Sequence, residues 1–148
     1  MKKILSMMLC ICLLLGTAAA EEAVSEDSFL LRIWNESGTE ISYLHFDFYT
    51  GDILATTTAS CPNEGEEFYR AECSMTPEQL KDLRIRCAYG ISALEPEEAL
   101  MEFMKGNPGE EHPVAMPELK PENGRVYDLE LVPDGEGGLK LQIVETVG

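Results

Sequence analysis

Six residues between Arg32 and Tyr49 combine aromatic rings with hydrogen-bonding groups. They alternate with apolar residues in the stretch 29–49, FLLRIWNESGTEISYLHFDFY, which predicts two strands folded back on each other through a polar turn. In that hairpin the six share the outward face: Arg32, Trp34, Tyr43, His45, Asp47 and Tyr49. Aromatic rings stack on sugars, and exposed aromatic residues also mark protein interfaces. We therefore expect a binding face for a carbohydrate or a protein; the alternative is that a helix or strand covers these rings and makes them a second core layer.

Residues with catalytic chemistry are scarce. His45 and His112 are the two histidines, and no Ser or Cys nucleophile motif lies near either. Adjacent glutamates occur at 66–67, 97–98 and 110–111, but a chain with 27 acidic residues produces such pairs by composition. A glycosidase needs two carboxylates that converge across a cleft. We expect no enzyme activity, and a small carboxylate-based hydrolase is the alternative.

Two patterns have some resemblance to metal sites. Met101, Met104, His112 and Met116 offer soft ligands suited to copper(I), yet methionines at helical spacing are more simply core residues. The stretch 134–136, Asp-Gly-Glu, lacks the spaced acidic ligands of a calcium loop and is more simply a hairpin turn. We expect neither a metal nor a cofactor.

Seven segments have the alternation of β-strands. Besides the two strands of the opening hairpin, they are 53–59, 66–74, 83–89, 124–132 and 139–145. The opening hairpin supplies the predicted core: Phe29, Leu31, Ile33, Leu44, Phe46 and Phe48. The last two strands form a second hairpin around the loop 133–138. Its inward residues are Tyr127, Leu129, Leu131, Leu139, Leu141 and Ile143, and its outward ones are Asp128, Glu130, Lys140 and Gln142.

Two helices interrupt the strands. Thr76 followed by Pro77 predicts a short capped helix through Asp82. The stretch 96–105, PEEALMEFMK, begins with proline and glutamates and ends before Gly106, as a helix does. Its apolar stripe consists of Ala99, Leu100, Phe103 and Met104, and we expect it to pack on a sheet edge or over an open end. The proline- and glutamate-rich stretch 107–123 predicts an irregular surface connection.

The first 20 residues have the pattern of a secretory signal peptide. Two lysines precede an apolar run over 4–15, and small residues end in Ala18-Ala19-Ala20. The run is shorter than the ~20 residues of a membrane span, so an uncleaved anchor is the less favoured alternative. Cleavage before Glu21 leaves a flexible acidic lead-in, 21–27, and one domain, 28–148. We expect a protein that is secreted or held in the cell envelope, with no membrane segment after cleavage.

The negative charge of the chain limits the classes of partner that we expect it to bind. The net charge is −16, and without Lys2 and Lys3 the mature chain has nine basic and 27 acidic residues, a net charge of −18. Nucleic acids and anionic membranes are held by clustered lysine and arginine, so we expect neither as a partner. Such a surface favours solubility and cationic partners or calcium. The aromatic face adds a protein or carbohydrate as the expected partner.

Three cysteines remain after cleavage. Cys73 and Cys87 lie on inward faces of predicted strands, and if these strands are neighbours the two thiols form a disulfide. Cys61 competes for either partner, and three reduced thiols are the third alternative.

Two segments resemble small secreted proteins of Gram-positive bacteria that have no assigned function. The first is N-x-S-G-x-x-I-x-x-L with a following glycine turn, here Asn35, Ser37, Gly38, Ile41, Leu44 and Gly51. The second, N-G-x-x-Y-x-L-x-L with a later G-G-L, is here Asn123, Gly124, Tyr127, Leu129, Leu131, Gly137, Gly138 and Leu139. The resemblance implies an immunoglobulin-like fold and brings no active site, and the helix at 96–105 is an insertion relative to its pattern.

The fold class that we predict is mainly β, an immunoglobulin-like antiparallel sandwich of about seven strands with one or two short helices. The leading hypothesis for function is a secreted, non-enzymatic binding or interaction module. Besides the hydrolase, a second alternative is a protease inhibitor or host-directed effector that presents the loop 107–121.

Overall fold

The computed structural model describes residues 24–147, with side chains through Val144. The predicted signal peptide and the first part of the acidic lead-in lie outside the described residues. The described chain contains eight strands and two helices. The strands are β1 (Ser28–Asn35), β2 (Tyr43–Thr50), β3 (Ile53–Ser60), β4 (Phe68–Ser74), β5 (Leu83–Ile91), β6 (Glu110–Ala115), β7 (Val126–Pro133) and β8 (Leu139–Val147). The helices are α2 (Pro77–Lys81) and α3 (Pro96–Met104).

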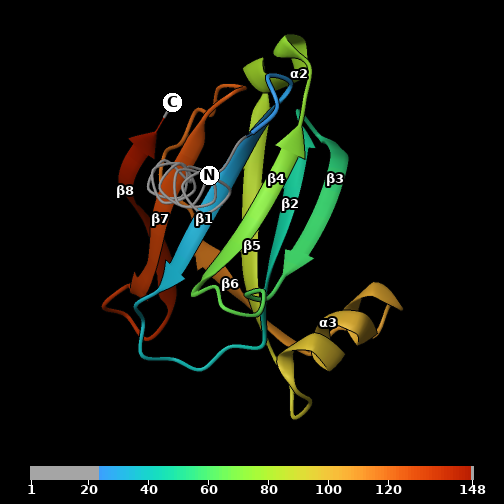
Figure 1. The fold of residues 1–148 in the computed structure, drawn as a ribbon, viewed down its shortest axis with the longest axis vertical. Coiled ribbons are helices and arrows are strands. Elements are labelled where there is room, and N and C mark those ends of the chain that lie inside the picture. The colour runs from blue at the N-terminus through green and yellow to red at the C-terminus, as the bar shows by residue number, and fades with distance from the viewer. Residues whose placement is uncertain (1–23, 148) are drawn as a thin grey trace, which may run out of the picture.

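All eight strands belong to one curled sheet, in the order β3-β2-β5-β6-β8-β7-β1-β4 (Figure 1). Most neighbours are antiparallel, but β1–β7 and β6–β8 are parallel pairs. The sheet curls until its edge strands β3 and β4 approach each other, with Cα atoms within 8 Å. The mainly β class is thus confirmed. The immunoglobulin-like sandwich is not, because a single sheet connects every strand.

The opening hairpin was predicted wrongly. β1 pairs with β4 and β7, whereas β2 pairs with β3 and β5, so the two strands are not neighbours. The connection between them crosses from one side of the core to the other, and Asn35 fixes its start by bonding to Ser37 and Thr39. Period-two alternation determines which face of a strand is buried, but it carries no information about the neighbouring strand.

The predicted core is confirmed. Its six residues are 0% exposed: Phe29, Leu31, Ile33, Leu44, Phe46 and Phe48. They meet across the curled sheet, where the rings of Phe29 on β1 and Phe48 on β2 lie edge to face at 5.9 Å. This contact joins the two halves of the sheet, β3-β2-β5-β6 and β8-β7-β1-β4, around one apolar interior.

The terminal hairpin β7–β8 forms as predicted, with two exceptions. Ile143 is 42% exposed instead of buried, next to the point where the register between the strands shifts, between Asp128 and Leu129. Asp128 is 8% exposed instead of solvated, because its carboxylate pairs with Arg32. The other inward residues of this hairpin are buried as expected: Tyr127, Leu129, Leu131, Leu139 and Leu141.

Part of the predicted irregular connection 107–123 is the strand β6. It pairs with β5 over five residues, 87–91, and with β8 only at Val114 and Ala115. Pro113 lies within it and contributes no N–H, and acidic residues begin it, so its composition is that of a loop. After β6, Met116 and Leu119 pack against the core.

Both helices begin at the prolines that predicted them, Pro77 and Pro96. In α2 the hydroxyl of Thr76 accepts from the Gln79 amide at 3.2 Å, and the Gln79 side chain accepts from the Thr76 amide at 2.9 Å. α3 buries Ala99, but Met101 and Met104 are 59% and 78% exposed, so neither methionine is the core residue that we expected. Within the described chain, neither helix has the length and apolar character needed to cross a membrane.

The described cysteines carry free thiols. Cys73 and Cys87 are buried in the core, and Cys61 is half-buried. Their strands, β4 and β5, are not neighbours in the sheet, so the adjacency that a disulfide required is missing. Burial raises the pKa of Cys73 to about 11 and also raises the pKa of Cys87.

Candidate functional site

The six residues predicted to share one face form two separate groups. Arg32 and Trp34 lie on β1, whereas Tyr43, His45, Asp47 and Tyr49 lie on β2. Because β1 and β2 belong to opposite halves of the sheet, the single aromatic face is a wrong prediction. The outward direction of these side chains was predicted correctly, since each alternates with a buried neighbour.

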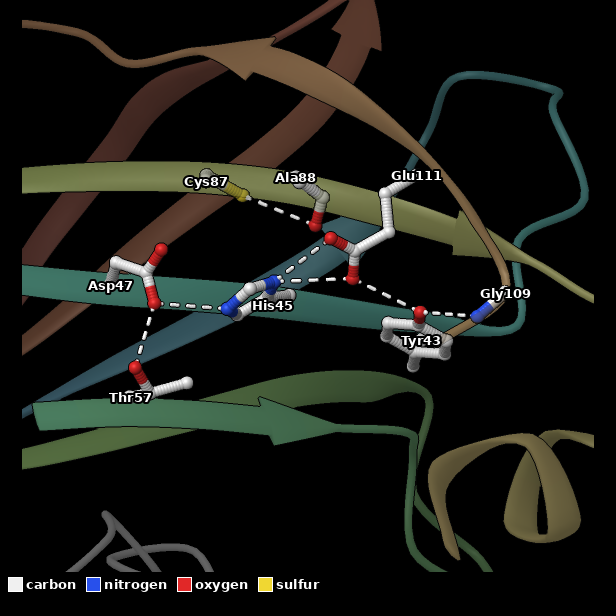
Figure 2. A network of polar contacts seen from close by, with 8 residues as sticks. All are labelled: Tyr43, His45, Asp47, Thr57, Cys87, Ala88, Gly109 and Glu111. Atoms are coloured by element: carbon white, nitrogen blue, oxygen red, sulfur yellow. Dashed lines mark hydrogen bonds and ion pairs between the residues drawn. The ribbon is translucent and has the colours of Figure 1, made fainter. Parts of the chain in front are cut away.

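The first group is the His45 network, which consists of Tyr43, His45, Asp47, Thr57 and Glu111 (Figure 2). His45 Nδ1 lies 3.1 Å from Glu111 Oε2, and His45 Nε2 lies 2.9 Å from Asp47 Oδ1. The Thr57 hydroxyl donates to the same Asp47 oxygen at 2.8 Å. With both carboxylates ionised, both contacts are hydrogen bonds only when the imidazole carries two protons, since a neutral ring has one donor.

Small residues on β5 allow this network to form. In the register of β2 and β5, Gly90 lies opposite Tyr43 and Ala88 lies opposite His45. A Cβ at Gly90 would be 2.1 Å from the Tyr43 ring. The two rings therefore extend across β5 to reach Glu111 on β6, one strand further along the sheet.

Helix α3 covers part of this group. Phe103 lies 5.2 Å from the Tyr43 ring and 4.7 Å from His45, and Tyr43 is 0% exposed. Tyr43 donates to Glu111 and accepts from the Gly109 amide, both at 3.0 Å. Burial raises the pKa of the Tyr43 hydroxyl to about 12, and the bond to Glu111 adds to this shift. For Tyr43 and His45 the alternative interpretation is thus confirmed, because a helix makes them a second packed layer.

An open groove of about 490 Å³ runs beside the network, lined in part by Arg86, His112 and Met116. The carboxylates of Asp47 and Glu111 border it, but they bond to opposite sides of the His45 ring. These two acids therefore hold an imidazole between them and do not face each other across the groove. Tyr49 lies further along β2 under the guanidinium groups of Arg84 and Arg86, at 5.2 and 6.0 Å.

The second group is the Trp34 face, which consists of Arg32 and Trp34 on β1, Phe68 and Arg70 on β4, and Asp128 on β7. The register places Trp34 beside Phe68, and Arg32 between Arg70 and Asp128. The two rings are in contact, with centroids 5.2 Å apart. Both remain partly exposed on the outward side of the sheet.

Charge pairing holds the Trp34 face in place. Arg32 donates to both oxygens of Asp128, at 2.7 and 2.9 Å, and the two side chains are only 16% and 11% exposed. This bidentate bond fixes the guanidinium 5.5 Å from the Trp34 ring and 5.8 Å from the Phe68 ring. Asp128 therefore holds a guanidinium beside both rings.

Sequence reasoning missed several members of both groups. Phe68 and Arg70 alternate with the buried Tyr69 and Ala71, so their outward direction was readable, but the pairing of β4 with β1 was not. Glu111 lies on the strand that was taken for a loop.

The four side chains considered above as soft metal ligands do not converge. Met101 and Met104 are exposed on α3, while His112 stacks on Tyr89 at 5.1 Å and Met116 packs against the core. Within residues 24–147, no group of three or more His, Cys, Asp and Glu side chains is arranged to hold a metal ion.

The stretch 134–136 lies in a hairpin turn, the simpler interpretation of its sequence. Asp134 accepts the amides of Glu136 and Gly138, as in a hairpin turn. These bonds lower the pKa of Asp134.

Comparisons with known proteins add no identity. No protein-family model, no curated protein and no solved structure matches the chain. The resemblance to small secreted proteins of Gram-positive bacteria stays a prediction.

Proposed function

We propose that this protein is a secreted, non-enzymatic binding module of the bacterial cell exterior, and that it binds its partner through the Trp34 face. The observation that carries the proposal is a pair of touching, partly exposed rings, Trp34 and Phe68, held beside a guanidinium that Asp128 fixes in place. Tryptophan, phenylalanine and arginine are enriched where proteins bind partners. A surface that is already ordered loses little conformational entropy on binding.

The contacts of the other group, the His45 network, favour a structural role for it. Its rings are packed under α3, and its carboxylates are bonded within the network. The arrangement of Asp47 and Glu111 on either side of His45 also favours binding over the carboxylate-based hydrolase, which needs two acids free to act on one substrate bond.

The immunoglobulin-like sandwich belongs to the same proposal. Only the pairs at Val114 and Ala115 join β6 to β8, so the sheet consists of two four-stranded halves that face each other across one core. Two packed halves of this kind support a sandwich-like architecture with a binding surface on one outer face.

A glycan array and a pull-down from the protein's native medium test the proposed binding face. We expect Trp34→Ala to abolish or strongly weaken any interaction that the wild-type protein makes. Tyr49→Ala is the matched control, because Tyr49 is also a partly exposed aromatic residue beside arginines but lies on β2. If Trp34→Ala leaves every detected interaction unchanged, or if Tyr49→Ala weakens it equally, the Trp34 face is not the binding site.

A further inference from the structure

A groove runs along the outward side of β7, next to the Trp34 ring. It has a volume of about 290 Å³ and is lined by Trp34, Glu36, Asp128, Glu130 and Val144. Trp34 comes from β1 and Val144 from β8, so an aromatic residue and an aliphatic residue flank the strand that lies between them. Asp128 and Glu130 belong to β7 itself, and Glu36 follows directly after β1. We call this site the β7 groove.

The carboxylates of the β7 groove are only partly neutralised. Arg32 pairs with Asp128 through both carboxylate oxygens. Glu130 accepts a bond from the Gln142 amide at 3.2 Å, a neutral donor that leaves its charge in place, and Glu36 is exposed. Three carboxylates against one guanidinium give the groove a formal net charge of −2. The whole chain is acidic as well, with a net charge of −16, so the surrounding field attracts cations.

The groove therefore combines a ring and an aliphatic wall with uncompensated negative charge. An aromatic face attracts a cation, apolar walls accommodate a methylene stem, and carboxylates bond to the charged head group. A lysine or arginine side chain has all three complementary features. A neutral sugar would gain hydrogen bonds from the same carboxylates but no charge pairing. We propose that the β7 groove binds the lysine or arginine side chain of an extended, basic segment of a partner protein. This inference rests on the proposed function, since it names the ligand class of the Trp34 face.

The sole tryptophan of the sequence makes the test direct. Trp34 lines the groove, so its fluorescence reports binding there without any added label. The mature protein is titrated at low ionic strength with trilysine, with trilysine acetylated on every amine, and with the neutral sugar chitotriose. We expect a saturable change with trilysine that weakens as salt is added, and no change with the acetylated peptide.

Matched variants separate the groove from the general charge of the protein. Glu130→Gln keeps the shape of the side chain and removes one charge, and we expect it to weaken trilysine binding roughly three- to five-fold. Glu78→Gln changes the net charge equally, but Glu78 lies on α2, at the end of the sheet away from the C-terminal end of β1 (Figure 1), and we expect no effect. Circular dichroism and the urea midpoint verify that both variants fold.

The possible outcomes distinguish this inference from the proposed function. The inference is overturned if trilysine gives no saturable change, if the acetylated peptide binds equally well, or if Glu78→Gln weakens binding as much as Glu130→Gln. It is also overturned if chitotriose alone gives the saturable change, and in that case the Trp34 face still binds a ligand and the proposed function stands. The proposed function itself fails if Trp34→Ala leaves all interactions in the array and the pull-down unchanged, or if Tyr49→Ala weakens them equally.

Discussion

Gly90 controls whether the His45 network can form, and Gly90→Ala tests this directly. The new Cβ would lie 2.1 to 2.6 Å from three atoms of the Tyr43 ring. The ring has little room to move, because Tyr43 is 0% exposed and Phe103 packs against it. Its hydroxyl also makes two bonds, to Glu111 and from the Gly109 amide. The substitution must therefore displace a packed ring and its polar contacts together.

The magnitude follows from these contacts. Overpacking of a buried site costs roughly 1–3 kcal/mol. Loss of the two hydrogen bonds adds about 1 kcal/mol each. Alanine in place of glycine within a strand stabilises by roughly 0.5 kcal/mol, because the unfolded chain is less flexible. We expect Gly90→Ala to lower the free energy of unfolding by about 3 kcal/mol, measured by urea denaturation.

A double-mutant cycle with Tyr43→Ala identifies the cause. In the Tyr43→Ala background the ring is gone, so Gly90→Ala has nothing to displace and we expect it to cost close to zero. If Gly90→Ala costs the same in both backgrounds, the close approach of Gly90 to the Tyr43 ring is not what matters. If it costs less than about 0.5 kcal/mol in the wild-type background, the ring is free to move and the reasoning is wrong.

Two further predictions concern other buried groups. Arg32→Met keeps much of the side-chain volume but leaves the buried Asp128 carboxylate without its bidentate partner. We expect the free energy of unfolding, measured by urea denaturation, to fall by about 2–3 kcal/mol and to recover in part in the double variant with Asp128→Asn. An unchanged stability in the single variant would contradict the role of this pair. Burial raises the pKa of Cys73 from 9.0 to about 11 and that of Tyr69 from 10.0 to about 12. Both groups then hold their protons in the folded state while the unfolded chain loses them. The stability that these two groups contribute is therefore complete below pH 9 and is lost between about pH 9 and 12. The urea midpoint should be lower at pH 10.5 than at pH 8, with a smaller fall in Cys73→Ala; equal midpoints at the two pH values would refute this.

The faces of the strands could be predicted from the sequence, but the order of the strands could not. Alternation identified Phe29 and Phe48 as buried and Trp34 and His45 as outward, because pleating sends successive side chains to opposite faces. The pairing of β1 with β4 depends on how all eight strands share one core, which no local pattern encodes. Consecutive strands are often neighbours, and that tendency led to the wrong opening hairpin.

In the candidate site, too, the direction of the side chains could be predicted but the neighbouring strands could not. Trp34 and Arg32 were chosen correctly as outward residues of β1, but the Trp34 face also needs Phe68 and Asp128, which lie 34 and 96 positions away from them in the chain. Strand β6 was missed because the glutamates and Pro113 outweigh its two apolar residues in any propensity scale. Its pairing with β5 overrides that local preference, and it delivers Glu111 to His45.

The short junction between β6 and β8 has a mechanical consequence. Backbone bonding between the two four-stranded halves passes through only the pairs at Val114 and Ala115, while packing across the interior, as between Phe29 and Phe48, supplies the rest of the cohesion. Under tension or in mild denaturant, we expect the junction between β6 and β8 to open before the other strand pairs. Amides at 114–115 should then exchange with solvent sooner than those in the middle of β2 or β7.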